Sequence, residues 1–128
     1  MSKVVLITGG SSGIGKSIGE YLSDKGFTVY GTSRFPDNYT DSKFPLIKLD
    51  VTQTTSISAC VSELISKTGK IDVLINNAGV GITGPLEEIP MEEMKRNFET
   101  NLFGPVNMIN AVLPFMRSQH SGQILNIT

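Results

Sequence analysis

The amino-acid sequence predicts an α/β fold in which a doubly wound parallel sheet of about five strands is covered by helices on both faces. Two observations support this prediction. Short apolar runs alternate along the chain with segments of helical periodicity, as expected when a crossover helix follows each strand. The 13 glycines lie at the ends of these runs, where turns are needed. Ligands of such folds bind at the carboxyl ends of the strands, so the residues that follow each strand should carry the function.

The first apolar run, VVLIT at residues 4–8, is β-branched and uninterrupted, which is typical of a strand buried on both faces. The glycine-rich loop after it leads into a helix that begins at Ile14 and continues to Lys25, where Gly26 stops it. We expect the apolar stripe of this helix to pack against the sheet: Ile14, Ile18, Tyr21 and Leu22.

Further apolar runs predict four more strands, at residues 27–33, 46–50, 71–76 and 123–128. A polar loop that contains proline separates the strand at residues 27–33 from the strand at residues 46–50. A second helix begins at Thr54 or Thr55 and ends at Gly69. A third, longer helix begins at Pro90 and continues to about Arg117.

The composition limits the classes of function. Eleven basic and twelve acidic residues give a formal net charge of -1, and no cluster of Lys and Arg suggests nucleic acid or an anionic membrane as a partner. The single cysteine, Cys60, excludes an internal disulfide, and the apolar run after Lys3 is too short for a signal peptide. No metal-ligand cluster is visible. We therefore expect one cytoplasmic domain over residues 1–128 that binds a small molecule.

The segment GSSGIGKS, residues 10–17, satisfies two nucleotide-binding patterns. Read from Gly10, it is G-x-x-x-x-G-K-S, the phosphate loop of enzymes that bind ATP or GTP. Read from Thr8, it is TGGSSGIG, a glycine-rich turn of the Rossmann-like kind that holds a dinucleotide. Both patterns predict backbone N–H groups and a helix start around an anion. A phosphate-loop enzyme also needs a carboxylate for magnesium, which Asp50 could supply.

A residue about twenty positions beyond the glycines reads the ribose in a dinucleotide site. Ser33 and Arg34 lie at this distance. An acidic side chain here would bond the 2′-hydroxyl of NAD, whereas a guanidinium suits the 2′-phosphate of NADP. The sequence therefore predicts NADP(H) rather than NAD(H), with a solvated loop charge as the alternative for Arg34.

The segment NNAG, residues 76–79, follows the fourth predicted strand, and a triphosphate site has no use for it. Taken with TGGSSGIG, with Asp50 and Val51, and with Asn101 in TNLFG, it resembles the short-chain dehydrogenase/reductase family. The order and spacing of the motifs match over the whole chain. This resemblance makes the phosphate-loop match a coincidence, with Lys16 in the first helical turn.

The resemblance implies a role for each matching residue. The glycine loop would hold the pyrophosphate, the end of strand two the 2′-phosphate, and the ends of strands three and four the adenosine. Asn101 matches the active-site asparagine that helps to fix a proton-relay water, and Asn76 would stabilise the sheet. Alternatively, Asp50 caps the turn toward Thr52, and Asn101 is an ordinary helix residue. The implied cofactor-binding residues are Gly9, Ser11, Ser12, Gly13, Ile14, Gly15, Ser33, Arg34, Asp50, Val51, Asn77, Ala78 and Gly79.

The proton-transfer chemistry of the family uses a serine, a tyrosine and a lysine four residues after the tyrosine. YLSDK at 21–25 and YTDSK at 39–43 have this spacing, but the first lies on a helix that leads away from the ligand edge and the second lies near the adenosine end. In the family, the three residues follow the fifth strand, on which this chain stops. We therefore expect the amino-terminal, cofactor-binding half of an oxidoreductase, truncated before the last strands of the fold.

The complete protein would then move hydride between nicotinamide and a carbonyl or alcohol, whose identity the sequence does not reveal. Two other classes stay open: a phosphate-loop nucleotide hydrolase, and a non-catalytic fragment that binds a nucleotide or a partner. The third helix is apolar on more than one face, and the fifth strand is an unpaired edge. We therefore expect a homo-oligomer formed through residues 92–117 and the edge of that strand.

Overall fold

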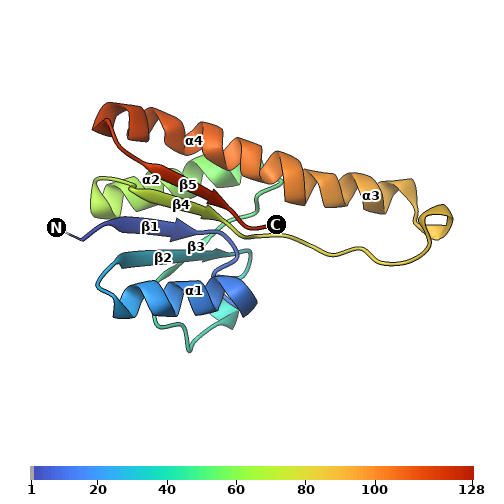
Figure 1. The fold of residues 1–128 in the computed structure, drawn as a ribbon, viewed down its shortest axis with the longest axis horizontal. Coiled ribbons are helices and arrows are strands. Elements are labelled where there is room, and N and C mark those ends of the chain that lie inside the picture. The colour runs from blue at the N-terminus through green and yellow to red at the C-terminus, as the bar shows by residue number, and fades with distance from the viewer. Residues whose placement is uncertain (1) are drawn as a thin grey trace.

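The computed structural model describes residues 2–128, which form a five-stranded sheet flanked by helices (Figure 1). The strands lie in the order β3-β2-β1-β4-β5, and every neighbouring pair is parallel. Their bounds are β1 (Val4–Ile7), β2 (Thr28–Ser33), β3 (Leu46–Lys48), β4 (Val73–Asn76) and β5 (Gln123–Asn126).

Helices cover both faces of the sheet. α1 (Gly13–Asp24) lies on one face, and α2 (Thr54–Thr68) and α4 (Gly104–Gln119) lie on the other (Figure 1). Successive side chains of a strand point to opposite faces, so Leu6 is buried in the core beneath α2 and α4, and Ile7 in the core beneath α1. The predicted Rossmann-like, doubly wound parallel sheet is confirmed.

The direction in which strands are added reverses at β1. From β1 the chain moves outward to β2 and β3, and then returns to place β4 on the other side of β1, with β5 beyond it. The loops that follow β1 and β4 therefore diverge. A crevice at the carboxyl ends of the strands, between such loops, is where doubly wound sheets bind ligands.

The helix predicted from Pro90 to Arg117 is present, but one of its turns is wider than an α-helical turn. α3 (Met91–Phe98) continues through a π-helical turn, η3 (Glu99–Phe103), into α4, and the cap residues keep right-handed helical dihedrals. Pro105 has no N–H, so it cannot donate the hydrogen bond to the Asn101 carbonyl that an α-helix requires. The wider turn accommodates this missing bond.

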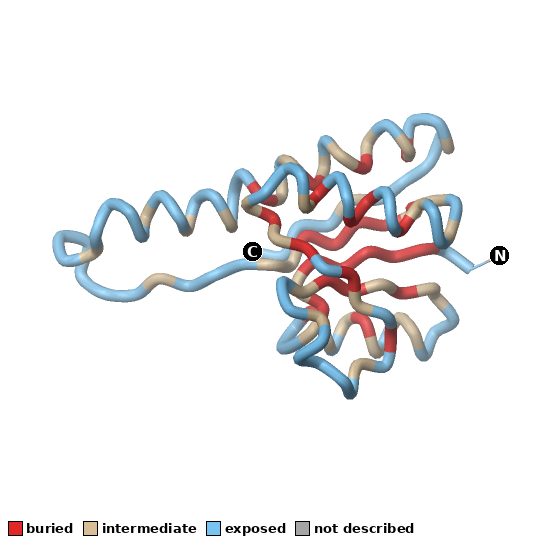
Figure 2. Tube along the Cα trace, turned by 180° about the vertical axis from the view of Figure 1, so that it is seen from behind, coloured by how far each residue is buried: buried red, intermediate tan, exposed pale blue. Residues whose placement is uncertain are grey.

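The segment between β4 and α3 forms an arm with α3 that projects beyond the sheet (Figure 1). It contains a short 3-10 turn, η2 (Leu86–Glu88); another, η1 (Pro36–Asn38), lies between β2 and β3. Figure 2 shows that the arm is exposed along most of its length. Several apolar side chains of the arm face solvent, namely those of Val80, Leu86, Met91 and Phe98.

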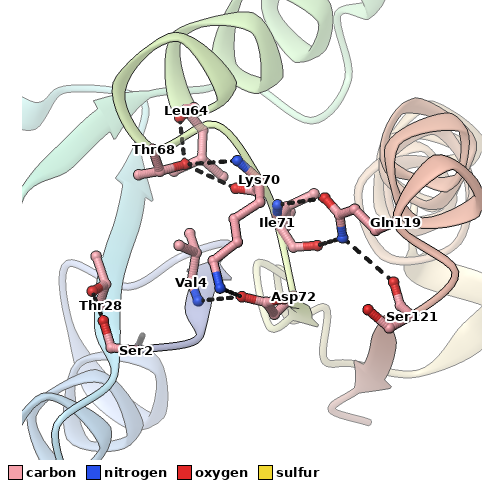
Figure 3. A network of polar contacts seen from close by, with 10 residues as sticks. All are labelled: Ser2, Val4, Thr28, Leu64, Thr68, Lys70, Ile71, Asp72, Gln119 and Ser121. Carbon is pink, nitrogen blue, oxygen red and sulfur yellow. Dashed lines mark hydrogen bonds and ion pairs between the residues drawn. The ribbon is translucent and has the colours of Figure 1, made fainter.

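Polar contacts tie the elements together at the edge opposite the crevice (Figure 3). The Asp72 carboxylate accepts the Val4 N–H at 2.7 Å and pairs with the Lys70 ammonium at 2.9 Å. Partial burial disfavours the Asp72 charge, but these two contacts outweigh it and lower the pKa of this carboxyl. The Gln119 amide donates to the Ile71 carbonyl at 2.8 Å and accepts the Ile71 N–H at 3.1 Å, which joins the end of α4 to the start of β4.

The stripe predicted for α1 is wrong at two positions. Ile18 and Leu22 pack against the core, but Ile14 and Tyr21 are 63% and 62% exposed. The residues of α1 that are buried are instead Gly15 and Gly19.

The side chain of Phe44, which is only 6% exposed, explains why glycines face the sheet. A methyl group added at Gly19 would overlap this ring, and one added at Gly31 would lie 2.6 Å from it. Gly10 is also a neighbour, since a methyl group there would lie 3.5 Å from the ring. The helix, the loop after β1 and the strand β2 each contribute a glycine to the space that one aromatic side chain fills.

Candidate functional site

A cleft of about 630 Å³ lies at the carboxyl edge of the sheet, at the crevice beside β1. The loops after β1, β2, β3 and β4 and one face of α3 line it. Most of the predicted site residues are brought together here: Gly9, Ser11, Ser12, Ser33, Arg34, Asp50, Val51, Ala78 and Gly79.

The other predicted residues lie beside or behind this lining. Within residues 2–128, the cleft is not lined by Gly13, Ile14, Gly15, Asn77 or Asn101. Ile14 lies on the exposed side of the first turn of α1, and Gly15 is buried against the neighbouring loop. Gly15 and Asn77 lie against Gly9, and Asn101 bonds to Val80, so these three contact residues of the lining.

The glycine loop is packed tightly against the turn that follows β4. Gly9 has a positive φ of 67°, and its N–H donates to Thr32 Oγ1 at 3.2 Å. The Asn77 side chain donates to the Gly9 carbonyl at 3.2 Å. A methyl group at Gly15 would overlap the Gly9 carbonyl oxygen and would lie 2.5 Å from Asn77 Nδ2. Only glycine therefore fits at position 15 without a backbone shift.

The amino end of α1 opens toward the cleft. Gly13 has a φ of 57°. Apart from its chain neighbours and the backbone of its own helix, no described atom lies within 4 Å of a methyl group built there. Ser12 is the N-cap, and its side chain makes no capping hydrogen bond in the part of the chain that the structure describes. Because Ser11 and Ser12 line the cleft, the amino end of α1 lies at its edge, where the unpaired N–H groups of a helix start can hold an anion.

The two side chains that a phosphate-loop enzyme would require have other partners. The Lys16 ammonium lies 3.4 Å from the Asp41 carboxylate. Asp50 Oδ1 accepts the hydroxyl and the N–H of Thr52, at 2.6 and 2.9 Å. These two bonds, aided by the charge of Arg34, hold the pKa of Asp50 below its ordinary value. The capping contact considered for Asp50 is therefore present, although this residue also lines the cleft.

Arg34 and Ser33 lie at the end of the cleft that follows β2. The Arg34 guanidinium is 5.8 Å from the centroid of the Phe35 ring, and Ser33 Oγ accepts the Phe35 N–H at 3.1 Å. Tyr39 also lines this end. The sequence analysis placed the segment 39–43 near the adenosine end but missed Phe35, because it lies in a long irregular loop whose path no periodic pattern specifies.

The NNAG turn is held by the end of β1. Thr8 Oγ1 accepts the N–H groups of Asn77 and Ala78 at 2.9 and 3.0 Å. Asn76 points into the core and donates to Asn126 Oδ1 of β5 at 2.9 Å, in keeping with the sheet-stabilising role expected for it. Two small residues, Ala78 and Gly79, are thereby left at the cleft wall.

Asn101 lies behind this wall and holds it. Its Oδ1 accepts the Val80 N–H at 2.9 Å, and its Nδ2 donates to the Val80 carbonyl at 2.8 Å. A methyl group at Gly79 would approach Asn101 Oδ1 to 3.0 Å. Both polar groups of the amide are therefore used to fix the backbone where the chain leaves β4.

α3 and the π-helical turn η3 contribute four further lining residues that the sequence analysis missed: Glu93, Arg96 and Asn97 from α3, and Thr100 from η3. Their spacing of three and four residues could have indicated that they share one helix face with Asn101.

Residues 2–128 contain no group of three or more His, Cys, Asp or Glu side chains that could hold a metal ion. They also contain no helix that is long and apolar enough to cross a membrane.

Comparison with known proteins identifies the family. A family model described as short chain dehydrogenase matches residues 3–128. The chain belongs to this family. The resemblance inferred from the glycine loop, the NNAG turn and Asn101 is therefore confirmed.

Other short-chain dehydrogenases share both sequence and fold with the chain. A 3-ketodihydrosphingosine reductase of Bacteroides thetaiotaomicron is 48% identical over 126 residues, which are 98% of this chain and 46% of that protein. The crystal structure of a short-chain dehydrogenase from Streptomyces avermitilis superposes with a TM-score of 0.90 and 38% identity, over 100% of this chain and 49% of that one. The NADP-bound structure of ElxO superposes with a TM-score of 0.88 and 30% identity, over 100% of this chain and 56% of that one. The chain thus spans roughly half the length of these relatives.

Proposed function

We propose that this chain binds NADP(H) in the carboxyl-edge cleft and that the whole protein is a cytoplasmic oxidoreductase acting on a small carbonyl or alcohol substrate. The observation that carries the proposal is the position of Arg34, which lies beside Ser33 at the β2 end of the cleft. A guanidinium and a hydroxyl suit a phosphate group, and no acidic residue among 33–36 competes for a ribose hydroxyl. NAD(H) is the less favoured cofactor.

The cleft fits the remainder of a dinucleotide. The pyrophosphate would lie over Ser11 and Ser12 at the amino end of α1, where the unpaired N–H groups of the helix start could hold it. Asp50 and Val51 would contact the adenine. The small, neutral residues Ala78 and Gly79, which follow β4, would allow the adenosine ribose to approach the backbone.

The bound nicotinamide supplies or accepts the hydride, and the residues of this chain bind and orient it. We assign residues 1–128 to the cofactor-binding part of a larger domain, and Asn101 to holding the cleft wall close to the reacting groups. The reductase name of the relative at 48% identity supports a ketone as the reacting group of the substrate.

A thermal-shift comparison tests the proposal. We expect NADPH to raise the melting temperature of the chain more than Mg-ATP does at equal concentration, because of two ligands that bind only the folded state, the one with the lower Kd stabilises it more. NADH serves as the second comparison and should have a smaller effect. Equal or greater stabilisation by Mg-ATP would favour a phosphate-loop function and would contradict the proposal.

We also propose that the chain self-associates through the exposed apolar side of α3 and α4 and through the edge of β5. Phe98, Leu102, Phe103 and Val106 are between 43% and 56% exposed, and within residues 2–128 β5 has β4 as its single neighbour in the sheet. Apolar surface and unpaired strand edges favour association with a second copy. Light scattering on the purified chain should give a mass of at least two copies, and the double variant Leu102→Glu, Val106→Glu should lower it. A wild-type chain that is monodisperse and monomeric would contradict this expectation.

A further inference from the structure

A second asparagine, Asn97, joins the contact between Asn101 and Val80. Its Nδ2 donates to the Val80 carbonyl at 3.1 Å, so this oxygen accepts hydrogen bonds from two side-chain amides. Its Oδ1 accepts an N–H of Asn101 at 3.4 Å. Asn97 therefore contacts both the fixed backbone and the side chain that fixes it.

These bonds determine how the amide of Asn101 is turned. One N–H of Asn101 Nδ2 is used by Val80 and the other by Asn97, while Oδ1 is used by the Val80 N–H. A rotation of the Asn101 amide by half a turn would place Nδ2 against the Val80 N–H and Oδ1 against Asn97 Oδ1. Asn97 thus favours the one orientation in which Asn101 holds the backbone of Val80.

The two asparagines reach the same carbonyl oxygen from neighbouring turns of one helical rod. Asn97 lies near the end of α3, and Asn101 lies in η3, one turn later on the same face. Because the hydrogen bonds to Val80 are exposed, water competes for each of them, and a second amide on the same carbonyl keeps it paired when one bond opens.

The wall that Asn97 helps to hold lies far from Arg34. Arg34 follows β2 and Val80 follows β4, with β1 between these strands. Val80, Gly81 and Ile82 line the cleft beyond Gly79, the last residue expected at the adenosine ribose. A dinucleotide with its 2′-phosphate at Arg34 would extend its nicotinamide half toward this wall.

We infer that Asn97 is a positioning residue, which holds residues 80–82 as the wall for the nicotinamide half of the cofactor by sharing the Val80 carbonyl with Asn101 and by orienting the Asn101 amide. The inference rests on the proposed function, because it assumes that NADP(H) occupies the cleft. It assigns Asn97 no contact with the reacting atoms.

The test measures the affinity of the 128-residue chain for two ligands by titration calorimetry. NADPH has both halves, whereas adenosine 2′,5′-bisphosphate has only the half that would bind at Arg34. Asn97→Ala removes both contacts, and Asn97→Asp keeps the shape but replaces the donor with a carboxylate facing the Val80 carbonyl. Each variant should weaken NADPH binding about three- to tenfold, as expected for the loss of a partly exposed hydrogen bond, and should leave the bisphosphate affinity unchanged.

Asn110→Ala is the matched control, because Asn110 is an exposed asparagine on the same helical rod, at a distance from the cleft. It should change neither affinity. A readout without ligand is amide hydrogen exchange, which should become faster in the segment around Val80 in both Asn97 variants and not in the control.

The outcomes separate the inference from the proposed function. If the wild-type chain binds neither ligand, the proposed function is wrong and the inference is overturned with it. If the wild-type chain binds both but the Asn97 variants weaken both equally, or weaken neither, the inference alone is overturned. A selective loss of NADPH affinity together with faster exchange near Val80 supports it.

Discussion

Replacing Arg34 with Asp should weaken NADPH binding by about a hundredfold and should leave NADH binding within a few-fold of the wild type. The guanidinium is the cationic group at the β2 end of the cleft, and a phosphate that it holds makes charge-assisted hydrogen bonds. A carboxylate in its place removes these bonds and repels the 2′-phosphate. The same carboxylate can accept a hydrogen bond from the ribose 2′-hydroxyl of NADH. Calorimetric titration with both cofactors measures the preference.

Lys43→Asp provides the matched control for Arg34→Asp. Lys43 lies exposed in the same loop region, and the substitution changes the net charge by the same amount. If the effect comes from contact with the 2′-phosphate, the control should keep the preference of the wild type. If Arg34→Asp leaves the preference unchanged, Arg34 is a solvated loop charge and the assignment of NADP(H) loses its main support.

Gly15→Ala should destabilise the chain by about 2–3 kcal/mol, which corresponds to a fall in melting temperature of roughly 10 °C. The added methyl group would overlap the Gly9 carbonyl oxygen and would press against the Asn77 side chain. Relief requires the glycine loop to move away from the NNAG turn, which would break the bond from Asn77 to Gly9. NADPH affinity should therefore fall by more than tenfold even at temperatures where the variant stays folded.

Gly81→Ala separates the steric effect from the general effect of adding a methyl group at the cleft. Apart from the residues next to Gly81 in the chain, no described residue has an atom within 4 Å of a methyl group built there. The φ angle of Gly81 also lies outside the positive range that favours glycine. Circular dichroism melts of this variant should be close to those of the wild type. Equal melting temperatures for Gly15→Ala and the wild type would show that the loop relaxes freely and that position 15 does not require glycine.

The strands, the first two helices and the glycine loop could be predicted from the sequence, because each has a local signal. β1 and β4 are continuous apolar runs, and Gly69, a left-handed C-cap, ends α2 where the pattern predicts it. The strand ends also indicated most of the cleft lining, since parallel strands all end at one edge.

Features that depend on contacts between distant segments could not be predicted. Tyr21 fits the apolar periodicity of α1. In the structure, however, Gly19 packs against the Phe44 ring and Tyr21 is exposed to solvent. The hydrogen bonds from Asn97 and Asn101 to the Val80 carbonyl join residues 17 and 21 positions apart, and no local pattern in the sequence specifies them. Cytoplasmic location and the use of NADP(H) stay predictions.

The space filled by Phe44 has a consequence for how sequences of this fold can diverge. Gly19 and Gly31 both border one ring, so the volume available at each depends on what occupies position 44. A smaller residue at 44 would leave room for alanine at 19, and for alanine at 31 if the Leu46 side chain also moves, whereas either alanine beside phenylalanine would be excluded. We therefore expect these positions to covary among homologues, so that the loop after β2 and the helix α1 evolve as one unit.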